Sequence, residues 1–237
     1  MNPALPGIVA ISFYLLGSYS QVRSLITRTV TRRSDLVRFV LPALIFHGLF
    51  VYSVLETSSG IDLSFFNVAA LISLTINVAV LLASIREPVH NLYVFVFLIS
   101  ILTVAGCLAV HALAFSPTAT PRSVSPPLLF HIVVSVVAYS ILTLAACQSV
   151  LVLTMERRIR NRAAIDLFHL LPPLESLEAM LFRFLWAGLA ILTVSIATGF
   201  VFLADKFSEH LSQHHTVLSV ASWVVYTSLL AGHTKFG

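Results

Sequence analysis

The chain has 237 residues, of which 58% are hydrophobic and only 10% are charged, and its formal net charge is +4. Its mean hydropathy is +0.95, and the core of a water-soluble domain of this length cannot absorb so much apolar surface. These values exclude a water-soluble domain and indicate an integral membrane protein.

The apolar residues are grouped in long unbroken runs. In hydrocarbon such runs favour α-helices over a β-barrel, because each helix satisfies its own backbone groups. A membrane-spanning helix needs roughly 20 mostly apolar residues. Seven such runs follow one another at residues 6–21, 39–55, 65–84, 91–114, 128–154, 181–204 and 217–233. We therefore predict an all-α fold, a polytopic bundle of about seven transmembrane helices that forms a single domain over residues 1–237.

The first run is followed by basic residues, four arginines between residues 23 and 33. A signal peptide carries its charges before the apolar stretch, so we predict a retained helix. Most Lys and Arg residues fall in alternate loops, whereas the other loops hold only Arg122 and Lys206. Because short basic loops stay in the cytoplasm, we predict an outside N-terminus and a cytoplasmic C-terminus. The basic charge is explained by topology and anionic lipid, and no nucleic-acid partner is expected.

The second run contains a histidine, His47, about 8 residues or ~12 Å below the predicted outer surface. Titratable residues within a span are costly and usually have partners, which makes them candidates for function. The third run adds Asn67, Ser73 and Asn77, which most often serve helix packing. No intramembrane carboxylate pair is present in the sequence, which argues against a proton-coupled pump.

His131 opens the fifth run, about 4 residues or ~6 Å below the outer surface. Ser135 and Tyr139 follow at i+4 and i+8, so the three side chains form a polar stripe on one helix face. A neutral imidazole nitrogen can ligate iron, and haem combines an apolar macrocycle with propionates that seek water. His47 and His131 are both within reach of one buried ligand. The alternative is that each imidazole makes only a hydrogen bond between helices.

Later candidates are weaker. His210, His214 and His215 lie in the outer loop, but their spacing is a poor zinc signal without Cys or a neighbouring Glu-x-x-His pattern, so we expect a solvated loop. Trp223 lies one turn before Tyr226 in the seventh run, where helix packing is the usual role. Stacking on a porphyrin is the alternative for Trp223.

Three stretches occur in a specific order over residues 128–237. They are the helix around His131, the segment Leu171–Arg183 with the helix Gly188–Gly199 after it, and the segment Leu218–Lys235. Together they resemble the cytochrome c assembly family of integral membrane proteins, of the CcsA, CcmC and HemX type. The resemblance implies haem b as cofactor, with His131 as the outer axial ligand.

Four further residues complete the predicted haem-binding set. His47 is predicted as the second iron ligand or as a deeper one, and Ser135, Tyr139 and Trp223 as the remaining cofactor-binding residues. The tryptophan-rich outer loop of the better-known members is missing, and the chain stops at Gly237 where such proteins continue. We therefore expect the small HemX-like inner-membrane subgroup and a chain that is truncated at its C-terminus.

The predicted function is haem binding and handling in the bacterial inner membrane, in cytochrome c assembly or haem homeostasis, without enzymatic activity. The expected partners are haem, membrane lipid and other cytochrome c maturation or haem-pathway proteins. Two alternatives stay open. One is a small-solute transporter, and the other is a non-binding scaffold that tethers a cytoplasmic partner through the basic inner loop 155–179.

Overall fold

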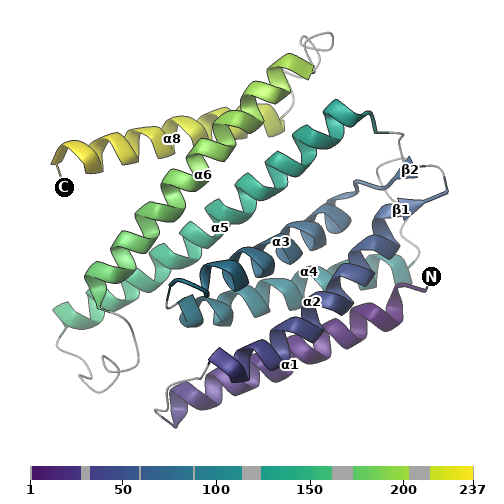
Figure 1. The fold of residues 1–237 in the computed structure, drawn as a ribbon, viewed down its shortest axis with the longest axis horizontal. Helices are drawn as coiled ribbons and strands as arrows, with labels where there is room; N and C mark the ends of the chain where they lie inside the picture. The colour runs from purple at the N-terminus through teal and green to yellow at the C-terminus, as the bar shows by residue number, and fades with distance from the viewer. Residues whose placement is uncertain are drawn as a thin grey trace. The chain divides into compact units, whose positions relative to one another are not determined.

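The structure is a computed structural model that describes residues 2–27, 33–58, 60–87, 89–113, 124–161, 173–202 and 214–236. Helices dominate these residues (Figure 1): α1 (Ala4–Ile26), α2 (Arg33–Leu55), α3 (Phe65–Ala83), α4 (Tyr93–Ala112), α5 (Pro126–Arg160), α6 (Leu174–Phe202) and α8 (His214–Phe236). A 3-10 helix, η1 (Val89–Leu92), precedes α4. Strands β1 (Glu56–Thr57) and β2 (Gly60–Ile61) form an antiparallel hairpin.

Seven helices in the described residues are long and apolar enough to cross a membrane. This confirms the predicted all-α bundle of seven spans. The predicted orientation, with the N-terminus outside, stays a prediction. The side chains of His210, His214 and His215 lie outside the described part of the chain.

Two helices are longer than their apolar runs. α5 has 35 residues and α6 has 29, so at ~1.5 Å per residue α5 measures about 52 Å, well beyond the ~30 Å of a hydrocarbon core. The extra turns are polar, with Arg157 and Arg158 in the last turn of α5 and Glu175 in the first turn of α6. We therefore expect both helices to continue into the interfacial region at this end.

The chain divides into two compact units, each described here by itself. Unit 1 comprises Met1–Ser123 and Thr154–Pro173, and unit 2 comprises Val124–Leu153 and Leu174–Gly237. The prediction of one transmembrane domain over residues 1–237 stays a prediction.

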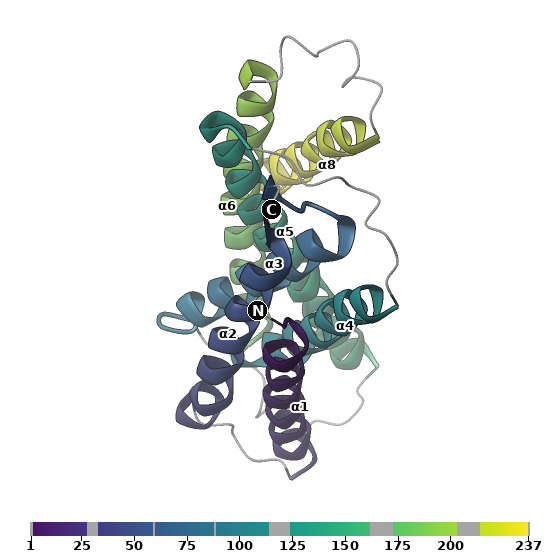
Figure 2. The same ribbon diagram turned by 90° about the vertical axis from the view of Figure 1, so that its right-hand side faces the viewer.

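Unit 1 contains helices α1 to α4, and Figure 2 shows α1 with α2 on one side and α4 on the other. α3 packs against both α2 and α4. The core between the helices is apolar and includes Phe50, Val51, Val54, Ala70, Val104 and Cys107. The α2–α3 connection turns at Gly60, whose φ of 132° lies in the region that favours glycine. The Asn67 side-chain amide then donates to the carbonyls of Val54 and Asp62, at 3.1 and 3.2 Å, which fixes the hairpin on the helices.

Unit 2 contains α6, α8 and most of α5. Gly188 of α6 lies so close to α5 that a Cβ built on it would be 2.6 Å from Cδ2 of Leu142. Such close approach through small residues is the usual way in which transmembrane helices associate. At another point of the α5–α6 pair, the Gln148 side-chain amide donates to the Leu177 carbonyl at 2.9 Å. α8 packs on the same pair through Leu230, which is buried with Ala145, Leu185 and Leu189.

The close approach at Gly188 predicts that Gly188→Ala destabilises unit 2. The added methyl group would clash with both Cδ2 and Cγ of Leu142, and overpacking of this kind costs roughly 1–3 kcal/mol. Gly232→Ala is the matched control, because beyond its own stretch of helix no atom of the described residues lies within 4 Å of the Cβ position there. Thermal unfolding in detergent, followed by circular dichroism, is expected to show a lower midpoint for Gly188→Ala than for Gly232→Ala. Equal midpoints would contradict the packing described.

Candidate functional site

The imidazole of His131 bridges two helices of unit 2. His131 lies in the second turn of α5 and is half-buried. Its Nδ1 is 3.1 Å from the hydroxyl oxygen of Thr198 on α6. The Ser135 hydroxyl, one turn later on α5, donates to the His131 carbonyl at 2.7 Å and lies 2.7 Å from the Ser195 hydroxyl of α6. Both the side chain and the backbone of residue 131 are thus tied to α6.

Gly199 makes room for this imidazole. A Cβ at position 199 would lie 3.1 Å from Cε1 and 3.6 Å from Nδ1 of His131. The ring therefore packs against the backbone of α6, which only glycine permits without displacement. The sequence analysis included these two residues in the matched helix Gly188–Gly199 but did not place Thr198 or Gly199 at the site. The sequence did contain a signal for this contact. Ser195, Thr198 and Gly199 are small or hydroxyl-bearing, and their i, i+3, i+4 spacing places them on one helix face.

The other two residues of the predicted polar stripe, Ser135 and Tyr139, contact two different helices, α6 and α8. Tyr139 is 38% exposed, and its hydroxyl pairs with that of Ser219 on α8 at 2.5 Å. The indole N–H of Trp223, also on α8, donates to the Thr193 hydroxyl of α6 at 2.9 Å. Ser135, Tyr139 and Trp223 therefore each have a polar partner within unit 2. Their predicted contact with a cofactor stays a prediction.

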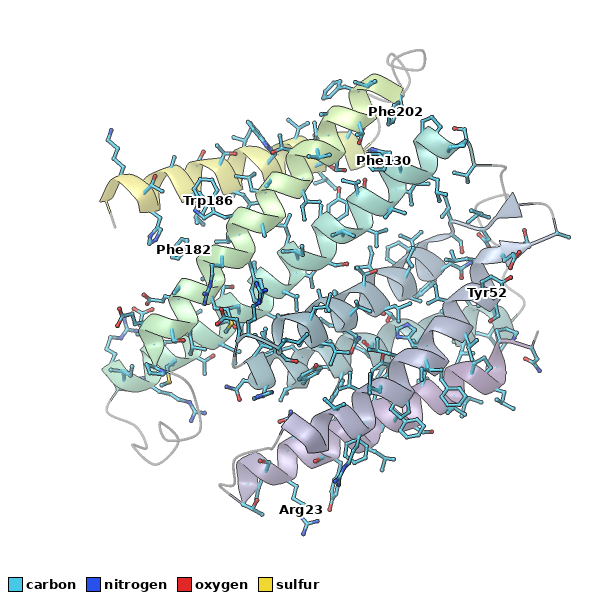
Figure 3. The ribbon with its side chains drawn as sticks, viewed as in Figure 1. Arg23, Tyr52, Phe130, Phe182, Trp186 and Phe202 are labelled. Carbon is cyan, nitrogen blue, oxygen red and sulfur yellow. The ribbon has the colours of Figure 1, made fainter. Side chains whose placement is uncertain are left out.

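Exposed aromatic side chains lie at the ends of α5 and α6 that flank His131. Phe130, its neighbour in the chain, is 52% exposed, and Phe202 at the end of α6 is 43% exposed. Figure 3 shows both at the same end of unit 2. An imidazole at the border of an apolar surface is suited to a ligand that is itself largely apolar.

His47 lies in the core of unit 1 and is fully buried. Its Nδ1 is 2.9 Å from the hydroxyl of Tyr14 on α1, and the two rings meet edge to face with centroids 5.7 Å apart. The Ala70 carbonyl of α3 is close to the imidazole, yet Nε2 has no partner that meets hydrogen-bond geometry among the described residues. Tyr14 is a residue that sequence reasoning missed, because a single hydroxyl in an apolar run gives no pattern.

Other buried polar side chains of unit 1 pair across α3 and α4. The Asn77 amide donates to the Ser100 hydroxyl at 2.6 Å, and the hydroxyls of Ser73 and Thr103 lie 2.7 Å apart. These pairs confirm the packing role expected of Ser73 and Asn77. The side-chain oxygen Oδ1 of Asn77 is buried without a partner in the part of the chain described.

The structure assigns His131 and His47 to different units. That both imidazoles reach one ligand stays a prediction. No group of three or more His, Cys, Asp or Glu side chains that could hold a metal ion occurs among the described residues.

Residues 37–237 match the family model described as cytochrome c assembly protein. The chain is 28% identical over 185 residues to the inner membrane protein YpjD of Escherichia coli K12, an alignment that covers 77% of this chain and 67% of that protein. It is 38% identical over 108 residues to an uncharacterized 28.8 kDa protein of Azospirillum brasilense, covering 45% of this chain and 40% of that protein. No solved structure matches the chain.

The buried contact between Tyr14 and His47 predicts that Tyr14→Phe destabilises unit 1. The substitution keeps the ring but removes the hydroxyl, so the fully buried imidazole loses its hydrogen bond at Nδ1, at a cost of roughly 1–3 kcal/mol. Tyr19→Phe is the matched control, since Tyr19 lies on the same helix and is 65% exposed. We expect a lower thermal unfolding midpoint in detergent for Tyr14→Phe alone. If the two variants unfold together with the wild type, the hydrogen bond does not stabilise the fold.

Proposed function

Because the chain belongs to the cytochrome c assembly protein family, we propose that it binds haem b and holds or passes it in cytochrome c assembly or haem homeostasis. It is a multi-pass protein of the bacterial inner membrane, with seven apolar helices and a relative named for that membrane. In this proposal it makes and breaks no covalent bonds. Other cytochrome c maturation or haem-pathway proteins would supply or receive the haem.

The observation that carries the proposal is the environment of His131. Its Nδ1 is occupied by Thr198, whereas Nε2 makes no hydrogen bond within the described residues. The ring is half-buried at one end of unit 2, so it combines a fixed position with access to a ligand. Such a nitrogen would be well placed to hold haem iron.

The surroundings of His131 fit the other demands of haem. A porphyrin needs apolar surface for its macrocycle, and the exposed rings of Phe130 and Phe202 offer it. When bound, haem would supply a redox-active iron with one position for the imidazole. The residues of this chain would bind and orient it, with Ser135 holding α5 on α6, and with Tyr139 and Trp223 holding α8 beside them.

His47 is proposed as a second iron ligand, either shared with His131 or at a deeper site. Its support is the unpartnered Nε2 in a fully buried position. An unsatisfied buried nitrogen costs about 1–3 kcal/mol, which a ligand would offset. Haem coordination by His47 requires the side chains around it to move, because the residue has no exposed surface.

One observation favours a transporter as the second candidate function. Unit 1 contains several buried polar side chains between α3 and α4, among them Asn77 and Ser100. A transporter needs a polar path at this depth, and uptake of a labelled solute into vesicles would separate the two functions. The scaffold alternative depends on the basic inner loop 155–179, and loss of a bound cytoplasmic partner on replacing Arg157, Arg158 and Arg160 would favour it.

The proposed function predicts a haem spectrum that depends on His131. Purified protein in detergent is titrated with haem, and the wild type is expected to show a shifted Soret band that His131→Ala loses. His111→Ala is the control, because His111 lies in the last turn of α4, in unit 1, and is no part of the proposed site. We expect that variant to bind haem as the wild type does.

His47→Ala completes the series. If it alters the band as strongly as His131→Ala, both imidazoles ligate haem, and if it leaves the band unchanged, His47 is a residue of the core. An unshifted Soret band in the wild type, or one that His131→Ala retains, would overturn the proposed function.

A further inference from the structure

We propose that Thr198 is a positioning residue that fixes the tautomer of His131, so that the proton is on Nδ1 and Nε2 carries the free lone pair. This inference rests on the proposed function for its purpose, because a free Nε2 is what iron requires. The tautomer itself follows from the hydrogen bonds of the protein alone.

The assignment begins with the Thr198 hydroxyl, which has one proton to donate. Thr198 Oγ1 lies 2.9 Å from the Ser195 carbonyl oxygen, which can only accept. The hydroxyl proton therefore goes to Ser195, and the same oxygen meets Nδ1 of His131 with a lone pair, at 3.1 Å. It follows that Nδ1–H donates to Thr198. A neutral imidazole has one N–H, so Nε2 is left unprotonated.

The next residue of α6 fixes where the ring lies. Gly199 then sets the position of the ring, because a side chain there would meet Cε1 at 3.1 Å and Nε2 at 3.9 Å. Thr198 and Gly199 are adjacent on α6, so one short segment provides both the acceptor and the space.

As a result, Nε2 of His131 is already unprotonated, and ready to bind iron, in the protein without haem. Histidines that bind metals usually donate their other ring N–H to a protein acceptor, which fixes the tautomer and makes the ligating nitrogen more basic. Loss of such a partner typically costs about 10–100-fold in metal affinity. Thr198 would thus strengthen the bond to iron without touching haem.

The first test uses the protein without haem. Protein labelled with 15N-histidine is compared as wild type, Thr198→Val and Thr198→Ser, with the His131 resonances identified by their absence from His131→Ala. Wild type and Thr198→Ser are expected to show the proton on Nδ1, because both keep the hydroxyl. Thr198→Val is expected to shift the tautomer population toward Nε2–H. A valine variant with the wild-type tautomer, or a serine variant without it, would overturn the inference.

The second test uses the haem-loaded protein. Thr198→Val is expected to weaken haem binding about 10–100-fold and to raise the midpoint potential, because a less basic imidazole stabilises ferric iron less. Thr198→Ser is expected to restore both values. Thr143→Val is the matched control, since that hydroxyl donates only to the Tyr139 carbonyl of its own helix. If Thr198→Val keeps the affinity and potential of the wild type, Thr198 has no role toward haem.

The failures of the two proposals are distinguishable. Haem binding that survives His131→Ala removes the proposed function, yet leaves the 15N result for the tautomer intact. An unchanged tautomer in Thr198→Val removes the role of Thr198, yet leaves a His131-dependent Soret band intact.

Discussion

Hydrocarbon offers no hydrogen-bond partners, so each polar side chain within a span must be satisfied by another part of the protein. In unit 1 this requirement is met by carbonyls of the same helix, as for Ser100, and by side chains of neighbouring helices, as in the pairs Asn77–Ser100 and Tyr14–His47. In unit 2, within the residues that the structure describes, Thr198 meets it at Nδ1 of His131 and no residue meets it at Nε2. The need for hydrogen-bond partners thus joins the helices of unit 1. In unit 2 it leaves Nε2 of His131 available to a ligand.

The geometry at His131 depends on how closely α5 and α6 approach. Small residues of α6 allow the contact, with Gly188 against Leu142 and Gly199 against the imidazole. Two hydroxyls, Ser135 and Ser195, then link the helices beside it. Apolar packing and hydrogen bonding thus act at the same α5–α6 interface. The position of the His131 imidazole therefore depends on the stability of this helix pair.

Much of the fold could be predicted from the sequence, because the length and hydropathy of a span are local properties. The end of α5 and the start of α6 were missed, since these turns are helical without being apolar. His131 was identifiable by its depth in an apolar run and by its resemblance to a known family. Thr198 and Gly199 could not be assigned to it, because their role depends on which helix face meets α5. Tyr14 also lay beyond sequence reasoning, and its partner His47 is 33 residues away.

The central claim is that Nε2 of His131 coordinates haem iron. It is tested most directly by electron-nuclear double resonance on the ferric haem complex of protein labelled with 15N-histidine. The account predicts a strong hyperfine coupling from a histidine nitrogen in the wild type, its loss in His131→Gly, and an unlabelled coupling when imidazole is added to that variant. A 15N coupling that persists unchanged in His131→Gly would contradict it.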